Sequence, residues 1–391
     1  MKIVHIITRL ILGGAQENTL ITCKLLADRG HDVTLITGPA LGPEGHLFDR
    51  ALKAGFKTIV IDKMRRAIIP PYDLVTYFQL KGLLKKLRPD IVHTHSAKAG
   101  ILGRYVGYSL KGSFDETERP YVVHTIHGLA FHPYLSKRKN DFYIAIENAA
   151  AKRTDAFISV ADTMTEKALA VGMGTDDMFT TAYSAIEEEG YLTPPSPSQV
   201  ADFRRRYGIS DQATVLVTIA RLAELKGHAY IIESAKRLAE KHPDCVWLFV
   251  GDGELASDIK SDIQMSGLQY RFKFTGLIDP SKIPLAIHSS DILVHCSLRE
   301  GLARALPQAM LCGKPVVSFD IDGAKEVVNS DTGFLIPAED VASLTDACRR
   351  LIEDPSLRKT LGSNAKAFVA NKFAPATMVD TIESVYNKLM R

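Results

Sequence analysis

The sequence has few cysteines and no long apolar run. Its five cysteines are an odd number, lie far apart and include no Cys-x-x-Cys pair. Neither a disulfide framework nor a zinc ribbon is therefore indicated, and we expect a reducing, cytoplasmic compartment. No uninterrupted apolar run reaches the ~18 residues that a membrane span needs, so we expect any membrane contact to be peripheral.

Charge of one sign is scarce as well. The chain has 48 Lys and Arg against 45 Asp and Glu, a formal net charge of +3. Such a balance does not favour nucleic acid as a partner. The apolar N-terminus is interrupted by His5 and Arg9 and runs into Gly13-Gly14 without a small-residue cleavage site. We interpret it as a buried strand and a glycine turn, not as a signal peptide.

The composition is that of a globular protein, and the length of 391 residues suggests two or three domains. Short apolar runs alternate with longer amphipathic stretches along the whole chain. The expected strands lie at 2–8, 32–37, 57–61, 90–93, 121–125, 155–160, 214–220, 245–250, 271–274, 291–295, 315–319 and 333–336. They lack polar alternation, which indicates parallel sheets covered by helices on both faces.

We predict two doubly wound, Rossmann-like α/β domains, over residues 1–182 and 183–373, with a Pro/Ser-rich stretch after Tyr191 between their patterns. The last helix, within 374–391, fits either domain, and one alternative is that it crosses back onto the first. A ligand is expected in a cleft between the domains, at the carboxyl ends of both sheets.

Glycines follow the first strand and open the first helix. Gly13 and Gly14 either let the backbone approach an anionic ligand at the helix N-terminus or form a plain tight turn. The full Gly-x-Gly-x-x-Gly spacing is absent, and no acidic residue ends the second strand, which counts against a dinucleotide.

Two loops of the second half combine charge with a helix start. Arg221 and Lys226 follow its first strand, where two cations suit a diphosphate, although solvated surface charges are the alternative. In the second loop, Glu300 suits sugar hydroxyls and Gln308 suits ribose hydroxyls, while backbone N–H groups of Gly301, Leu302 and Ala303 suit phosphate oxygens. A plain helix start with a capping carboxylate is equally compatible with this second loop.

Histidines gather at the strand ends of the first half, at His93, His95, His124 and His127. Residues i and i+2 of a strand share a face, so a metal site is conceivable, but no Asp, Glu or Cys set accompanies them and we predict none. His127 ends a strand that should point into the cleft. Asp320-Ile-Asp322 has the form of a metal–diphosphate signature, yet a turn or cap is the commoner role and we assign it no magnesium.

Residues 71–88 form an amphipathic helix with a cationic edge. Such a helix suits anionic lipid headgroups, although a solvated helix face is the plainer alternative.

Taken together, these motifs resemble the family 4 retaining glycosyltransferases of the GT-B fold, and the resemblance covers nearly the whole chain. In the first half the matching motifs are Gly13-Gly14-Ala15-Gln16, Arg29-Gly-His-Asp-Val33, Pro89-Asp-Ile-Val-His-Thr-His95 and His124-Thr-Ile-His-Gly128. In the second half they are Arg221…Lys226-Gly227, Val250-Gly-Asp-Gly253, Phe274-Thr-Gly276, Ser290-Asp291, Glu300-Gly301, Ala309-Met310, Gly313-Lys-Pro-Val-Val317 and Thr332-Gly333-Phe-Leu335.

The resemblance implies a role for each candidate residue. Arg221 and Lys226 would hold the donor diphosphate, and Gly13 and Gly14 would lie near the phosphate and the acceptor. Glu300 would contact hydroxyls of the donor sugar, and His127 would sit at that sugar. The residues around Gly276 and Ile278 would wall the base pocket.

Two positions depart from the family pattern. The pattern Glu-x7-Glu is here Glu300-x7-Gln308, and an amide lacks the charge that strengthens a bond to a ribose hydroxyl. The usual Asn-Gly-Ile-Asp turn appears as Ser184-Ala-Ile-Glu187. A full match would specify the base and the ribose more tightly.

We therefore expect a metal-independent, retaining transfer of a hexosyl unit from a UDP- or GDP-sugar to a hydroxyl of a glycan or lipid-linked acceptor. No cofactor is expected beyond the sugar nucleotide, which is a co-substrate. The implied setting is cell-surface polysaccharide or glycolipid assembly, in the cytoplasm or at the inner face of the membrane. The alternatives are a sugar-nucleotide 2-epimerase on the same scaffold and a non-catalytic sugar-nucleotide-binding protein.

Overall fold

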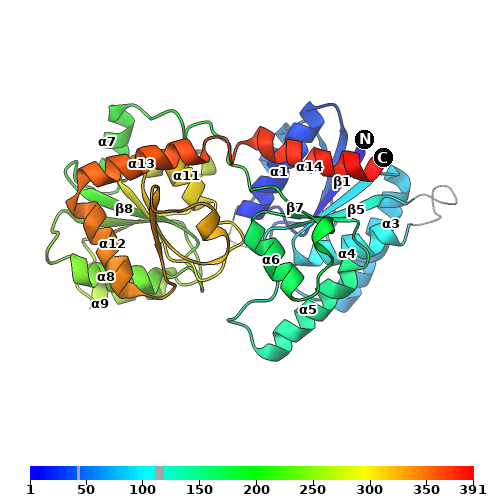
Figure 1. Cartoon of the computed structure of the whole chain (residues 1–391), viewed down its shortest axis with the longest axis horizontal. Coiled ribbons are helices and arrows are strands. Elements are labelled where there is room, and N and C mark those ends of the chain that lie inside the picture. The colour runs from blue at the N-terminus through cyan, green and yellow to red at the C-terminus, as the bar shows by residue number, and fades with distance from the viewer. Residues whose placement is uncertain (42–44, 111–118) are drawn as a thin grey trace. The chain divides into compact units, whose positions relative to one another are not determined.

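The computed structural model describes residues 1–41, 45–110 and 119–391 (Figure 1). The chain divides into two compact units. The first contains Met1–Ala185 together with Pro375–Arg391, and the second contains Ile186–Ala374.

The first unit is built on a seven-stranded parallel sheet. Its spatial order is β3-β2-β1-β4-β5-β6-β7, so the direction of strand addition reverses between β1 and β4. The strands are β1 (Lys2–Ile7), β2 (Asp32–Thr37), β3 (Lys57–Val60), β4 (Ile91–His95), β5 (Tyr121–Ile126), β6 (Ala156–Ser159) and β7 (Phe179–Thr181). Loops that leave β1 and β4 therefore flank the point where a ligand of a doubly wound sheet is expected.

Helices cover both faces of this sheet. They are α1 (Gly14–Asp28), α2 (Phe48–Lys53), α3 (Pro70–Leu87), α4 (Ala97–Tyr108), α5 (Lys137–Ala151), α6 (Asp162–Ala170) and α14 (Pro375–Met390), with a 3-10 turn at Asp176–Met178. Alternate residues of β1 pack into two core clusters, one on each face of the sheet. Ile3 and Ile7 pack in a cluster with residues of α1 and α14, whereas Val4 and Ile6 pack with residues of α3 and α4.

The C-terminal helix α14 belongs to the first unit, although the segment before it belongs to the second. Its Met378, Ile382 and Tyr386 are buried in the core cluster that also contains Ile3, Ile7 and residues of α1. Arg29 also bonds Glu383 at 2.6 Å across the exposed edge. Surface pairs contribute about 0–1 kcal/mol each, whereas each fully buried apolar side chain contributes about 1.5–3 kcal/mol. Apolar burial therefore holds the helix in place.

The second unit has a six-stranded parallel sheet in the order β10-β9-β8-β11-β12-β13. The strands are β8 (Thr214–Ile219), β9 (Cys245–Val250), β10 (Phe272–Gly276), β11 (Ile292–His295), β12 (Val316–Phe319) and β13 (Gly333–Ile336). The helices are α7 (Pro197–Arg206), α8 (His228–Leu238), α9 (Ala256–Met265), α10 (Ile283–His288), α11 (Ala305–Leu311), α12 (Val341–Glu353) and α13 (Pro355–Val369), with 3-10 turns at Pro280–Lys282 and Asp322–Glu326.

The strand order of the second unit reverses between β8 and β11. Trp247 on β9 belongs to the core cluster of this unit, is 1% exposed and stacks on Phe272. The carboxyl ends of β8 and β11 thus lead into the loops with the candidate donor-binding residues.

The sequence-based fold class, two doubly wound parallel sheets, is confirmed. Most predicted elements agree with the structure to within a few residues at their ends. The short strand β7, whose side chains are only half-buried, was not predicted, and neither were the helices α2 and α6. Among the described residues, no helix combines the length and apolar character that would let it cross a membrane.

Candidate functional site

The second unit brings a cation and a carboxylate together at its switch point, the place between β8 and β11 where the strand order reverses. Lys226 lies in the loop after β8, and Glu300 lies in the loop after β11, 74 residues further along the chain. Lys226 Nζ donates a hydrogen bond to Glu300 Oε1 at 2.5 Å. Because β8 and β11 are neighbours, the fold joins two loops that the sequence separates. The predicted phosphate cation and the predicted sugar-binding carboxylate therefore share one site.

The charges around Glu300 keep it ionised. Burial on its own raises the pKa of Glu300, but the Lys226 ammonium and the His295 ring outweigh burial, so the pKa of Glu300 lies well below its ordinary value. His295 Nε2 lies 3.6 Å from the same carboxylate oxygen. At neutral pH Glu300 is thus an acceptor only, which suits the hydroxyls of a sugar.

A glycine sets the backbone beside Lys226. Gly227 begins α8 with φ +71°, in the left-handed region. A Cβ atom added there would lie 1.9 Å from the carbonyl oxygen of Cys296, directly after β11. Only glycine fits this contact, which holds the Lys226 loop against the strand that leads to Glu300.

Arg221 is held more loosely than Lys226. Its side chain is about half exposed, 46%, and its Nη2 lies 3.2 Å from an oxygen of Glu254, which is itself exposed. A pair this exposed contributes little to stability. The guanidinium can therefore exchange Glu254 for a diphosphate at small cost.

The Glu300 loop is anchored from behind by the Asp320-Ile-Asp322 segment. The Glu300 amide donates to Asp322 Oδ2 at 2.6 Å, and the Gly323 amide donates to the Gly301 carbonyl at 3.2 Å. Asp322 thus accepts from a backbone amide, which agrees with a turn role. The carboxylate acts on Glu300 through its backbone and is a site residue that the sequence did not assign.

The remaining predicted donor residues occupy separate places in the second unit. Leu302 and Ala303 are buried in the loop just before α11, and Gln308 is buried within the helix. Gly276 ends the edge strand β10 with φ +65°, and the half-buried Ile278 follows it. The sheet order places β10 two strands away from β8.

In the first unit, the glycine turn lies at the start of α1, after β1. Gly13 is half-buried and Gly14 is exposed. The φ of Gly13 is 178°, an extended value that any residue adopts. A Cβ atom there would meet only the flexible end of Gln16, at 2.7 Å. The conformation therefore does not itself require glycine, and any such requirement must come from a ligand.

His127 lies directly after β5 and lines a small pocket of the first unit. Ser96, Gly128 and Glu147 line the same pocket. The ring of His127 is hydrogen-bonded to a buried histidine, since its Nε2 lies 3.0 Å from Nδ1 of His95. His127 is thus the half-buried outer end of a row of histidine rings that the sequence suggested only in part.

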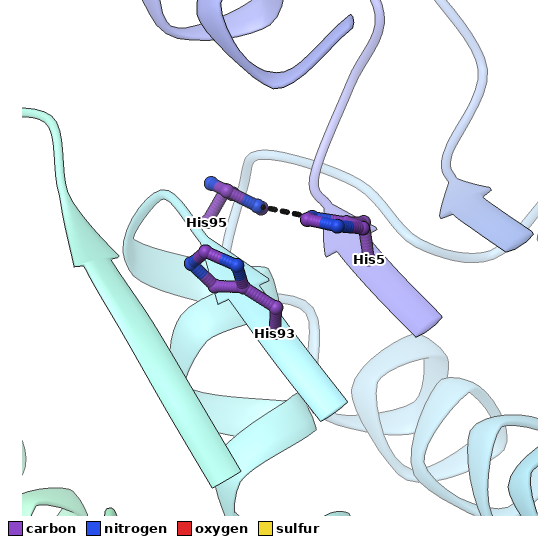
Figure 2. A group of neighbouring side chains, drawn as sticks. All are labelled: His5, His93 and His95. Carbon is purple, nitrogen blue, oxygen red and sulfur yellow. Dashed lines mark hydrogen bonds between the residues drawn. The ribbon is translucent and has the colours of Figure 1, made fainter. Parts of the chain in front are cut away.

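Three of those histidines, His5, His93 and His95, meet on one face of the sheet (Figure 2). Their nitrogens lie within 4.8 Å of one another, a spacing that a metal ion would tolerate. Hydrogen bonds already engage them, however. His93 bonds the hydroxyls of Tyr386 and Thr125, and His5 bonds His95. His124 faces the opposite side, toward α4.

The geometry therefore sorts the predicted residues into two groups. Gly13, Gly14 and His127 belong to the first unit, and all the other predicted site residues belong to the second. Within the second unit, the structure joins Lys226 to Glu300 directly. His5, His295 and Asp322 were missed, and only the i, i+2 spacing of His93 and His95 signalled the histidine cluster.

Comparison with known proteins agrees with this arrangement. Residues 12–178 match the family described as Glycosyltransferase Family 4, and residues 199–368 match the family described as Glycosyl transferases group 1. The chain is 30% identical over 390 residues to a UDP-Gal:alpha-D-GlcNAc-diphosphoundecaprenol alpha-1,3-galactosyltransferase of Escherichia coli, across 99% of this chain and 96% of that relative. It is 27% identical to an alpha-D-kanosaminyltransferase of Streptomyces kanamyceticus, across 85% and 90% of the two chains.

Solved structures show the same architecture. The Anabaena protein Alr3699/HepE in complex with UDP-glucose superposes with a TM-score of 0.83 at 21% identity, across 99% of this chain and all of the other. The structure of WaaG, a glycosyltransferase involved in lipopolysaccharide biosynthesis, superposes with a TM-score of 0.73 at 18% identity, across 97% and 98%. The two parallel sheets, the family matches and the full-length relative together establish that this chain belongs to glycosyltransferase family 4 and has the GT-B fold.

Proposed function

We propose that this glycosyltransferase moves a hexosyl unit from a UDP-sugar to a hydroxyl of a lipid-linked or glycan acceptor, with retention at the anomeric carbon. The observation that carries the proposal is the Lys226–Glu300 pair at the switch point of the second sheet. UDP is favoured over GDP because the Escherichia coli relative is named for UDP-Gal and the Anabaena neighbour was solved with UDP-glucose. The same relative's name supports a lipid-diphosphate-linked acceptor.

Binding of the donor rearranges the charges of this site. Lys226 turns from Glu300 to the diphosphate, and Arg221 leaves Glu254 to join it. Two cations then stabilise the negative charge that builds up on the departing nucleotide. Glu300 accepts from hydroxyls of the sugar, and the anchored backbone behind it keeps its position.

Retention is supported by the scarcity of carboxylates among the proposed site residues. Glu300 is tied to Lys226, and the other carboxylate of the site, Asp322, is engaged by the Glu300 backbone amide. A double displacement through a covalent intermediate needs a second, well-placed carboxylate. Attack on the same face, with the leaving diphosphate taking the acceptor proton, needs only positioning and electrostatic stabilisation.

The base and the ribose are assigned to the residues around Gly276, Ile278 and Gln308. The Gln308 amide can donate to one ribose hydroxyl and accept from another, but it lacks the charge that a carboxylate would bring. We also propose that transfer needs no metal ion, because Lys226 and Arg221 supply the positive charge that a divalent ion would otherwise supply.

Contact with the membrane is proposed for α3. The apolar side chains of Leu74 and Phe78 on this helix are 59% and 61% exposed, and Lys85 and Lys86 are exposed toward its C-terminal end. Exposed apolar residues beside lysines suit an interface with anionic lipid, where a lipid-linked acceptor would be anchored. Co-sedimentation with phosphatidylglycerol vesicles tests this. A Phe78→Ser, Leu74→Ser variant should bind fewer vesicles, and equal binding by the two proteins would remove α3 from the interface.

A thermal-shift panel of nucleoside diphosphates and their sugars tests the donor. A ligand present at ~100 times its dissociation constant adds about 2.7 kcal/mol to the stability. We expect shifts with UDP and one or two UDP-hexoses and little shift with GDP or GDP-mannose. Shifts confined to GDP ligands would contradict the base assignment. Incubation of the best donor without acceptor should release no epimerised sugar nucleotide, and an epimerised product would favour the 2-epimerase alternative.

A further inference from the structure

Two neighbouring strands, β1 and β4, place three histidines on one face of the first sheet. His5 on β1 pairs with His93 on β4, and Ile7 pairs with His95 two residues further along. This face packs against α1 and α14, and the three imidazoles are at most 1% exposed. Figure 2 shows the His5 and His95 rings pointing toward one another, with the His93 ring beside them.

The rings of His5, His95 and His127 form a continuous row of hydrogen bonds, here called the histidine row. His5 Nδ1 lies 2.9 Å from His95 Nε2, and His95 Nδ1 lies 3.0 Å from His127 Nε2. His93 stands beside the row, since its own nitrogens bond the hydroxyls of Tyr386 and Thr125. His95 is thus the one ring that uses both nitrogens inside the row.

The two inner rings of the row are neutral. Burial lowers the pKa of His5 to about 3, and burial together with the neighbouring histidines lowers the pKa of His95 well below its ordinary value. A neutral imidazole carries one N–H group and one lone pair. His95 therefore donates at one nitrogen and accepts at the other, so both bonds of the row run in the same direction.

The inner end of the row decides that direction. His5 Nε2 is buried and has no hydrogen-bond partner among the residues that the structure describes. If the row ran inward, from His127 to His5, this atom would carry a buried N–H group without an acceptor. If it ran outward, the atom would carry only a lone pair. An orphaned buried N–H is the rarer and costlier of the two, so the outward direction is favoured.

We propose that His5 and His95 are positioning residues that fix the tautomer of His127, so that His127 accepts at Nε2 from His95 and carries its proton on Nδ1. His127 then offers an N–H donor to the donor sugar. This role rests on the proposed function, whereas the tautomer itself follows from the row alone.

Two other readings of the cluster agree less well with its geometry. A proton relay needs a group at the inner end that takes up or releases the proton, and His5 Nε2 has no such partner among the described residues. A metal ion bound by both His5 Nδ1 and His95 Nε2 would need a lone pair on each, so the 2.9 Å hydrogen bond between them would be lost. The hydrogen-bonded row explains the contacts as they stand.

The tautomer of His127 can be measured directly on the wild-type protein. Long-range 1H–15N correlation spectra of the chain, labelled at its 12 histidines, separate protonated from unprotonated ring nitrogens. His127→Gln identifies the His127 signals by their loss. We expect the proton on Nδ1 of His127 and on Nδ1 of His95 at pH 7.5. A proton on Nε2 of His127 would overturn the proposal, whether or not any sugar nucleotide binds.

A matched pair of variants then tests whether the row supports transfer. In His5→Asn, the amide nitrogen stands near the position of Nδ1 and can still donate to His95, whereas His5→Leu removes the donor. We expect His5→Leu to mix the two tautomers of His127 and to lower kcat about tenfold, which corresponds to the loss of one hydrogen bond of about 1.4 kcal/mol. The KM for the sugar nucleotide should change less, and His5→Asn should keep most of the activity.

Tyr386→Phe is the control for a disturbed cluster. It removes the hydroxyl that bonds His93 and leaves the histidine row intact, so it should change neither the tautomer nor kcat. Unchanged tautomer and kcat in His5→Leu would overturn the positioning role. Failure of every nucleotide to shift the melting temperature would instead contradict the proposed function and leave the tautomer assignment standing.

Discussion

A fall in pH from 7.5 to 5.5 should destabilise the first unit strongly, because four of its histidines are buried in the neutral form. His5 and His93 are fully buried, and His95 and His124 are 1% and 5% exposed. Burial lowers the pKa of His5 to about 3 and the pKa of each of the other three well below its ordinary value.

The sign of the effect follows from proton linkage. The unfolded chain takes up a proton at each histidine near pH 6.5, whereas the folded chain does so only at much lower pH. The contribution of each group is therefore complete above pH 6.5 and is lost as the pH falls toward the folded pKa. One pH unit is worth about 1.4 kcal/mol per group, so four independent groups cost about 5–6 kcal/mol at pH 5.5. Typical proteins have about 5–15 kcal/mol in total.

Other groups contribute less within this window. The pKa values of Glu300 and Glu383 lie below their ordinary values, so these carboxylates weaken the fold only below about pH 4.5. In the second unit, burial and the nearby Lys226 lower the pKa of His228 to about 4, and burial also lowers the pKa of the half-buried His288, so two groups contribute there. The first unit should therefore respond more steeply than the second.

Urea unfolding at pH 7.5, 6.5 and 5.5 and constant ionic strength measures this difference. Trp247, the single tryptophan, lies in the second unit, so its fluorescence follows that unit, while circular dichroism follows both. We expect the dichroism transition to move further toward low urea than the fluorescence transition. His93→Leu should reduce the pH dependence by about one proton. A change below about 1 kcal/mol between pH 7.5 and 5.5 would refute the neutral, buried assignment.

Three further predictions concern the second unit. Lys226→Ala should abolish nucleotide-induced stabilisation and transfer while the chain stays folded by circular dichroism, since the residue is only half-buried, and near-normal turnover would remove its diphosphate role. Gly227→Ala should cost more than about 3 kcal/mol in urea unfolding because its Cβ would meet the Cys296 carbonyl at 1.9 Å, whereas Gly267→Ala, with a similar φ of +70° and open space, should cost only about 1 kcal/mol. Dialysis against EDTA should leave transfer unchanged, and activity that is lost and then restored by magnesium or manganese would contradict metal independence.

Much of the fold could be predicted because each strand and helix shows its pattern of apolar and polar residues within a short stretch of sequence. Apolar runs without polar alternation marked strands such as 245–250, and amphipathic stretches marked helices such as α14. The short strand β7 was missed because Phe179, Thr180 and Thr181 are half-buried and their pattern is too brief to stand out. The domain to which α14 docks was left open, because its apolar face fits any complementary core.

The candidate site could be predicted residue by residue but not as a geometry. Lys226 and Glu300 stood out because each follows a strand and precedes a helix, yet nothing local showed that one would bond the other. Asp322 was interpreted as a turn residue, and the structure adds that it holds the Glu300 amide. His5 carried no signal, since a lone histidine in an apolar strand has no pattern.

The sequence by itself determined the alternation of strands and helices, the two-domain organisation and the residue types available at each strand end, because these depend on patterns within a few residues. Only the tertiary structure decided which loops meet. Strand order places β8 beside β11 and so joins Lys226 to Glu300. The register of β1 on β4 brings His5 close to His95, and so forms the histidine row that ends at His127. Pairing and register depend on how whole elements pack together, and that packing is a property of the folded chain.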